Sequence, residues 1–349
     1  MSTRTAGKRR FVTLDALRGL GALIVMAGHS GAAFGSFGPR HFYLAVDMFF
    51  LLSGFVIAHA YDSRFERGLT FRDFMRARIR RLYPVFLVGL VIGEACTFAD
   101  NIHNMSNAQR AISFSLGLAA LPSPPTDSWA ALFPMNGPFW SLFFEFWVAN
   151  LAYGLFWRQI RGRLLRGIII VSGISLLAAV FYFRTMDIGW NWPTLPGGTA
   201  RVCFSFFSGV LLCRLHGRSS GADYQISSWM VLGAAALVFC IPFHGALGIL
   251  HDIAAVFLAF PAIVYFGASA LEKHPRIGAA LGDVSYAIYA IHRPLLIPAA
   301  LLLHSLTEMR GRGVQTIAAQ LVFMIAVTAF AWFIEATTQA KRKPREIPA

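Results

Sequence analysis

Residues 14–33 read LDALRGLGALIVMAGHSGAA, an apolar run that an arginine and a histidine interrupt. A run of about 20 residues, once helical, matches the hydrocarbon thickness of a bilayer. Ionisable side chains inside such a segment are costly unless they face a polar interior. The stretch therefore predicts a membrane helix that packs against other helices around a polar space.

Apolar runs of similar length recur along the whole chain. Hydrophobic residues make up 56% of the 349 residues and charged residues only 14%, whereas soluble domains carry about a quarter charged residues. The sequence predicts an all-α fold, a polytopic transmembrane helical bundle, with a single integral membrane domain over 1–349 and no appended soluble domain. About ten spans are expected, at 14–33, 42–60, 83–100, 139–157, 167–185, 199–213, 228–243, 249–271, 282–303 and 317–335.

The net charge of +14 is concentrated in short basic clusters between alternate runs, such as Lys8–Arg10, Arg64–Arg81, Arg158–Arg166 and Lys341–Arg345. The only basic residues in the loops on the opposite side are Arg40, Arg110, Arg310 and Arg312. Basic loops are retained on the cytoplasmic side of membrane proteins. This asymmetry predicts that both termini are cytoplasmic, and it explains the charge without a nucleic-acid partner.

Other signals restrict the range of sites. The four cysteines, Cys96, Cys203, Cys213 and Cys240, lie in or near apolar runs without paired spacing, so neither disulfides nor a metal site are expected. No cleavage-site pattern follows the first run, which is interpreted as a retained helix. The short apolar segment 111–121 precedes several prolines and is expected to lie on the outer surface or to re-enter the membrane.

Arg18 and His29 are eleven residues apart in the first span. At about 100° per residue this is close to three turns, so both side chains share one face of a helix, roughly 16 Å apart along its axis. Arg18 then lies toward the cytoplasm and His29 toward the outer side. The alternative is that Arg18 extends to the inner interface while His29 caps the outer end.

The second and fourth spans carry polar residues near the predicted depth of His29. Asp47 opens the second span, and Ser141 shares a helix face with Glu145 in the fourth. Either carboxylate is expected to orient or stabilise His29. Two alternatives remain at this stage: Ser53 serves close helix packing, and Trp140 is an interfacial anchor.

Two further patterns suggest binding functions. Arg78 and Arg81 are one helical turn apart, and paired guanidinium groups suit phosphate; the alternative is a topology anchor that contacts anionic lipid. Ser285, Tyr289 and His292 form a stripe at i, i+4 and i+7 in the ninth span. Such a stripe is expected to line a cavity or to hydrogen-bond within the bundle.

The ordered set of these segments resembles the membrane acyltransferase-3 family. The motifs are L-D-x-L-R-G with a histidine eleven residues after its arginine (Leu14–His29), V-D-x-F-F-x-x-S-G-F (Val46–Phe55), R-x-x-R-L-Y-P (Arg78–Pro84), W-S-L-x-x-E (Trp140–Glu145) and S-Y-x-x-Y-x-x-H-x-P (Ser285–Pro294). Two departures are Phe146, where members often have a second acidic residue, and the tail after Glu335. The resemblance covers the whole chain.

The resemblance implies a membrane O-acyltransferase in a bacterial inner membrane. Its acyl group, expected to be acetyl, would come from acyl-CoA as a co-substrate, with no permanently bound cofactor, and would reach a hydroxyl of a saccharide or lipid-linked sugar. Arg18, Arg78 and Arg81 would hold the coenzyme, and His29 would be the general base or would carry the acyl group in a relay. Glu145 or Asp47 would assist His29. The substrate cavity would contain Ser53, Trp140, Ser141, Ser285, Tyr289 and His292.

A membrane transporter or flippase is the alternative function. Polar residues in facing spans suit a translocation path equally well. The sequence lacks the repeated halves typical of many transporters, and an arginine pair at the inner mouth favours the enzyme.

Overall fold

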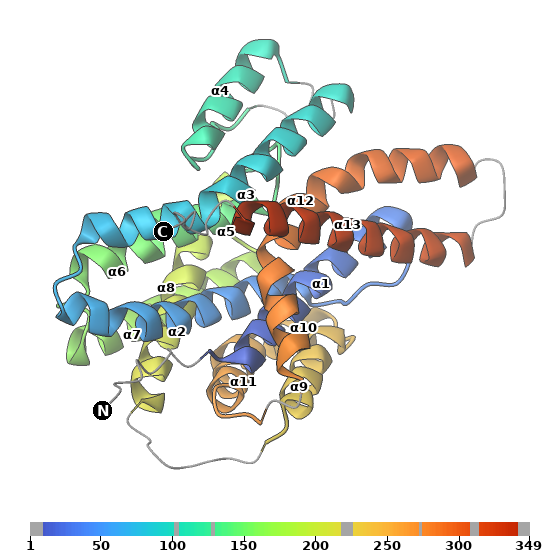
Figure 1. Cartoon of the computed structure of the whole chain (residues 1–349). Coiled ribbons are helices and arrows are strands. Elements are labelled where there is room, and N and C mark those ends of the chain that lie inside the picture. The colour runs from blue at the N-terminus through green and yellow to red at the C-terminus, as the bar shows by residue number, and fades with distance from the viewer. Residues whose placement is uncertain are drawn as a thin grey trace, which may run out of the picture.

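The computed structural model describes residues 10–100, 105–126, 130–217, 226–271, 274–307 and 314–340. The described part of the chain is helical, with two isolated β-bridges and no strand (Figure 1). The α-helices are α1 (Val12–Phe34), α2 (Ala45–Glu66), α3 (Phe71–Asp100), α4 (Asn107–Leu118), α5 (Phe139–Phe143), α6 (Leu151–Phe156), α7 (Gly162–Phe183), α8 (Leu195–His216), α9 (Ser228–Cys240), α10 (Gly245–Ala254), α11 (Phe260–Gly267), α12 (Pro275–Thr307) and α13 (Val314–Ala340). The basic clusters Lys8–Arg9 and Lys341–Arg345 lie outside the described residues.

The predicted polytopic all-α bundle is confirmed. Nine helical segments among the described residues are long and apolar enough to cross a membrane, and each corresponds to a predicted span. Two of them combine α-helices with π-helical turns, η2 (Phe144–Asn150) and η4 (Ala255–Ala259). The remaining predicted span, 228–243, is the 13-residue helix α9, which is shorter than the roughly 20 residues that a spanning helix needs.

The segment between the third and fourth predicted spans contains α4. This helix begins with a capping box, in which Ser106 and Gln109 each accept from the other's backbone N–H. Its 12 residues extend about 18 Å, well short of the roughly 30 Å hydrocarbon core. The prediction that this segment is not a full span is therefore confirmed.

The centre of the bundle is formed by α1 packed along α12 and by α2 packed along α8. The second contact depends on glycine. A Cβ atom at Gly54 would lie 1.9 Å from the carbonyl oxygen of Phe206, and one at Gly209 would lie 2.0 Å from that of Leu51. Glycine at both positions lets the backbones approach closely. This contact fixes the depth of the polar residues on α2.

The outer faces of α7 and α13 are apolar. Ile170, Val171 and Ile174 on α7 are exposed, as are Val322 and Ile325 on α13. Exposed apolar faces of this kind suit a lipid environment. Their position leaves the central helices to hold the buried polar groups.

Candidate active site

Two adjoining cavities lie among α1, α2, α3 and α12. The inner cavity, of about 70 Å³, is lined by polar side chains from these four helices and from α5 and η2. The second, of about 310 Å³, lies beside Arg10, Asp15 and Asp283 and is called the vestibule here. Both are lined by Arg18, Val56, Arg81, Leu82 and Tyr286. The shared lining places the vestibule directly beside the inner cavity.

Arg78 and Glu145 form an ion pair in the wall of the inner cavity. An Nη2–H of Arg78 donates to Glu145 Oε1 at 2.8 Å, and the Ser53 hydroxyl donates to the same oxygen at 2.7 Å. The Arg78 side chain is 5% exposed and that of Glu145 17%. Nε of Arg78 is buried without a partner among the described residues. The pair therefore keeps unused donor and acceptor capacity beside an open space.

The expected contact between Glu145 and His29 is wrong. Helix α3 begins at Phe71, so Arg78 is already helical and reaches the level of Glu145. Glu145 also lies in a π-helical segment, a local widening that occurs often at functional sites. A carboxylate pairs more strongly with a buried guanidinium than with a neutral imidazole, so Glu145 belongs to the arginines.

Arg18 and Arg81 complete the cationic lining. Both face the inner cavity and the vestibule, and in the described part of the chain no hydrogen bond is made by the Arg18 side chain. At the vestibule, Arg10 donates to Asp15 at 2.6 Å and to Asp283 at 2.7 Å. Burial alone would lower the pKa of Arg10, but these two carboxylates raise it above its usual value. The predicted clustering of Arg18, Arg78 and Arg81 is confirmed.

The rest of the inner cavity is hydroxyl-rich. Ser141 Oγ lies 2.7 Å from the Tyr289 hydroxyl, and Ser285 donates to the Gly282 carbonyl at 2.7 Å. Ser53, Ser141, Ser285 and Tyr289 line the cavity, as predicted. Trp140 does not belong to its lining; it is buried against the Arg201 guanidinium, 5.3 Å from the ring centroid. The expectation that Trp140 lines the cavity is therefore wrong.

His29 is paired with His292 rather than with a carboxylate. His29 Nδ1 lies 3.0 Å from His292 Nε2, and the rings stack at 5.2 Å. His292 is fully buried, and its Nδ1 lies 3.0 Å from the carbonyl oxygens of both Ile288 and Tyr289. His292 therefore supports His29 instead of lining the cavity.

This geometry fixes the protons of the neutral pair. A carbonyl oxygen only accepts, so His292 Nδ1 carries the hydrogen and His292 Nε2 accepts. The hydrogen between the rings must then come from His29 Nδ1. His29 Nε2 is left with its lone pair, the form that a general base needs.

The histidine pair follows directly on the inner cavity along α12. Tyr289 lines the cavity, and its ring centroid lies 6.0 Å from that of His292. Phe49, another lining residue, contacts the Tyr289 ring edge-on at 5.6 Å. Beyond the pair, Phe42 contacts the His29 ring at 4.9 Å. Arginines and histidines thus occupy successive levels along α1 and α12.

Asp47 belongs to a second ion pair, with Arg201 of α8. Arg201 Nε donates to Oδ1 at 3.1 Å and Nη2 to Oδ2 at 2.6 Å. Two backbone carbonyls, those of Ile188 and Tyr43, accept from the same guanidinium. The expected contact of Asp47 with His29 is therefore wrong, because a fully buried arginine takes both carboxylate oxygens. Sequence reasoning missed Arg201, although an arginine inside the predicted span 199–213 was the available signal.

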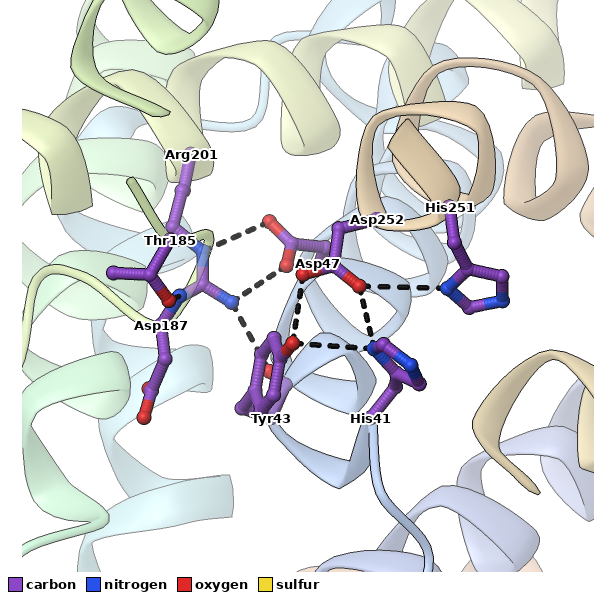
Figure 2. A network of polar contacts seen from close by, with 8 residues as sticks. All are labelled: His41, Tyr43, Asp47, Thr185, Asp187, Arg201, His251 and Asp252. Carbon is purple, nitrogen blue, oxygen red and sulfur yellow. Dashed lines mark hydrogen bonds and ion pairs between the residues drawn. The ribbon is translucent and has the colours of Figure 1, made fainter. Parts of the chain in front are cut away.

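The polar contacts around Asp47 extend to His41, Tyr43, His251 and Asp252 (Figure 2). The Tyr43 hydroxyl donates to Asp252 at 2.7 Å, and His41 Nδ1 lies 2.6 Å from Asp252 Oδ1. Burial lowers the pKa of His41, and the opposing charge of Asp252 does not restore it. Sequence reasoning gave His251 no role and overlooked His41 and Asp252, because these residues are distant in the chain.

Comparison with known proteins supports an enzymatic site. A family model described as an acyltransferase domain matches residues 11–336. Protein 2 in the picA locus of Rhizobium radiobacter is 34% identical over 186 residues, which are 50% of this chain and 96% of that protein. The peptidoglycan O-acetyltransferase OatA of Listeria monocytogenes is 27% identical over 231 residues, 61% of this chain but only 35% of that protein. No solved structure matches.

Proposed function

Because this chain belongs to the acyltransferase-3 family, we propose that it moves an acyl group, expected to be acetyl, from acyl-CoA to a hydroxyl of a saccharide or lipid-linked sugar. Membership makes it a multi-pass membrane acyltransferase. What we propose beyond this is the identity of the acyl donor, of the acceptor and of the general base. The observation that carries it is the His29–His292 pair, which leaves His29 Nε2 unprotonated one helical level beyond the arginine-lined cavity.

The arginine cluster is the proposed donor site. Acyl-CoA carries several phosphate groups, and guanidinium groups bind phosphate through paired hydrogen bonds. Arg18 and Arg81 face both the vestibule and the inner cavity, and Arg78 adds a third cation beside Glu145. The phosphates would stay near these arginines, and the narrow pantetheine arm would extend past Ser141 and Tyr289 toward the histidines.

Glu145 would prevent excess positive charge when the donor is absent. Its carboxylate accepts from Arg78 and Ser53 through one oxygen. A phosphate group that enters the inner cavity would compete with Glu145 for Arg78. Glu145 therefore has a positioning function at the donor site and does not orient His29.

In the proposed reaction the acyl group passes directly from the donor to the acceptor. His29 Nε2 takes the proton of the acceptor hydroxyl as its oxygen attacks the thioester carbonyl. The new C–O ester bond forms, the C–S bond breaks, and the proton passes from His29 to the coenzyme A thiolate. His292 would stabilise the transient positive charge, because its Nε2 accepts from the His29 Nδ1–H. His292 acts as a positioning residue through His29.

Two considerations suggest the acceptor: the name of the relative OatA and the chemistry of a general base. OatA is named as a peptidoglycan O-acetyltransferase, and a general base for acyl transfer requires a hydroxyl acceptor. We place the Arg18 end of α1 in the cytoplasm, where acyl-CoA is made, and the His29 end toward the outside of a bacterial inner membrane. The basic connections predicted to be cytoplasmic support this orientation.

The test is acyl transfer by the purified full-length chain in lipid nanodiscs. The donor is radiolabelled acetyl-CoA, and the acceptor is bacterial envelope glycan from which mild base has removed existing esters. Wild-type protein is expected to give base-labile label in the glycan. His29→Ala should lower the rate by at least about 100-fold, the size of a general-base contribution.

The matched control is His244→Ala, which removes an exposed histidine outside both cavities and should transfer at the wild-type rate. Full transfer by His29→Ala would overturn the assignment of His29 as base while leaving the enzyme class intact. Labelled enzyme that passes its acetyl group to added glycan would replace direct transfer by an acyl-histidine relay.

A further inference from the structure

Three metal-ligating side chains meet at the His41 end of the bundle. His41 lies in the turn before α2, and His251 and Asp252 are neighbours on α10 (Figure 2). One nitrogen from each histidine and one oxygen of the aspartate all lie within 4.8 Å of one another. His41 Nδ1 is 2.6 Å and His251 Nδ1 is 3.4 Å from Asp252 Oδ1.

His41 and Asp252 are buried, with side-chain exposures of 2% and 3%, and His251 is nearly so at 9%. Both imidazole rings turn the same atom, Nδ1, toward the same carboxylate oxygen, and their centroids are 4.3 Å apart. Two imidazoles that converge on one buried oxygen form a ligand set of two nitrogens and one oxygen. Such sets bind divalent transition metals.

No arginine or lysine among the described residues pairs with the Asp252 carboxylate. The Asp252 carboxylate contacts only His41, His251 and the Tyr43 hydroxyl among the described residues. The nearby guanidinium of Arg201 is already committed to Asp47. A buried carboxylate without a cationic partner is costly, and a bound dication would supply that partner.

We propose that His41, His251 and Asp252 bind a divalent transition-metal ion, with zinc as the first candidate. Three protein ligands of this type leave a fourth position for water or another oxygen. Ligand atoms about 2.0–2.1 Å from tetrahedral zinc lie roughly 3.3 Å apart. The His251–Asp252 separation of 3.4 Å already has this value, and the His41 ring would move back by several tenths of an ångström.

Tyr43 supports the arrangement from behind. Its hydroxyl donates to Asp252 Oδ2, leaving Oδ1 for the ion. Second-layer hydrogen bonds of this kind orient carboxylate ligands. The spacing of His41 from the other two residues hides the set from any local sequence motif, which is why sequence reasoning expected no metal site.

The site would connect the metal to the proposed base. Phe42 follows His41 directly and contacts the His29 ring at 4.9 Å. A metal ion between His41 and α10 would fix the turn that carries Phe42. Metal binding is nevertheless independent of acyl transfer, so the two proposals succeed or fail separately.

The experiment uses the full-length chain with a tag that contains no histidine, reconstituted in nanodiscs. A chelator removes metal, zinc is added at a small excess, and the protein is desalted before its zinc is measured by mass spectrometry. Wild type should retain about one zinc per chain, and added zinc should raise the melting temperature by several degrees. Retention below about 0.2 zinc per chain would overturn the site and leave a hydrogen-bonded cluster only.

His251→Ala and Asp252→Asn should each reduce retained zinc at least about fivefold, since a three-ligand site loses a ligand. His244→Ala, an exposed histidine before the same helix, is the matched control and should bind as wild type. Wild-type zinc retention in both ligand variants would also overturn the proposal. If those variants fail to fold, the wild-type protein is loaded with cobalt in place of zinc and its visible absorption is measured. An intense visible band supports the site, and its absence contradicts it.

Discussion

Two buried arginine–carboxylate pairs lie in this bundle, and they are satisfied to different degrees. In the Arg201–Asp47 pair both oxygens of the carboxylate are used, two backbone carbonyls take further donors, and the side chains are 0% and 1% exposed. In the Arg78–Glu145 pair one oxygen accepts one arginine hydrogen bond, and Arg78 Nε has no partner among the described residues. Of the two pairs, only the second lines the inner cavity, and neither Arg201 nor Asp47 lines the vestibule.

This difference separates support from binding. A buried guanidinium with all neighbours in place has nothing left to offer a ligand, and its role is to join α2 to α8. A buried guanidinium with an unused donor beside an open space costs desolvation free energy until a ligand accepts a hydrogen bond from it. Each pair should therefore respond to substitution in its own way, one in stability and the other in activity.

The largest effect is expected for Asp47→Ala. Removing this carboxylate leaves Arg201 buried and uncompensated, which costs about 3–5 kcal/mol when one partner of a buried pair is lost. The variant should show a strongly lowered melting temperature in nanodiscs, measured by intrinsic fluorescence. Reduced activity should follow only from the loss of folded protein.

The control is Arg76→Ala, which breaks an ion pair with Asp73 whose side chains are 63% and 51% exposed. Such a surface pair is worth about 0–1 kcal/mol, so the melting temperature should hardly change. A stability loss for Asp47→Ala no larger than this control would remove the distinction between the two buried pairs.

The second effect, on activity, is expected for Arg78→Met. The variant keeps much of the apolar volume but loses the cation, and a hydrogen bond to a charged group is worth about 1.5–3 kcal/mol. The KM for acetyl-CoA should rise roughly 10- to 100-fold, with a smaller loss of stability than in Asp47→Ala. The measurement is initial acyl-transfer rate against donor concentration.

Arg76→Met serves as the control because it lies on the same helix but is exposed and outside both cavities. It should leave the donor KM unchanged. An unchanged KM in Arg78→Met, with a melting temperature as low as that of Asp47→Ala, would make the Arg78–Glu145 pair structural as well.

The sequence predicted what depends on local periodicity. The length of apolar runs fixes the spans, and helical phase places Arg18 near Arg78 and Arg81, and Ser141 with Glu145 in one cavity wall. Partner choice was not predictable in this way. Glu145 and Asp47 were both expected beside His29, yet each meets an arginine, since a buried guanidinium attracts a carboxylate most strongly.

The remaining misses come from long-range packing and local irregularity. Arg201 and Asp47 are 154 residues apart, and His29 and His292 are 263 apart. Only the packing of α2 on α8, and of α1 on α12, brings them together. The π-helical turn at Glu145 also shifts the helix face relative to a regular 3.6-residue period, which spacing arguments do not anticipate.

The smallest effect is expected for Ser53→Ala. This variant tests whether Glu145 competes with the donor phosphate for Arg78. The Ser53 hydroxyl donates to the same Glu145 oxygen as Arg78, so its loss leaves that oxygen to Arg78 alone and tightens the pair. A neutral hydrogen bond is worth about 0.5–1.5 kcal/mol, so the donor KM should rise only a few-fold. In Arg78→Met the same change should have no effect on KM, because Glu145 no longer competes with the donor. Equal effects in both backgrounds would mean that Ser53 acts independently of the arginine, and the competition between Glu145 and phosphate would have to be abandoned.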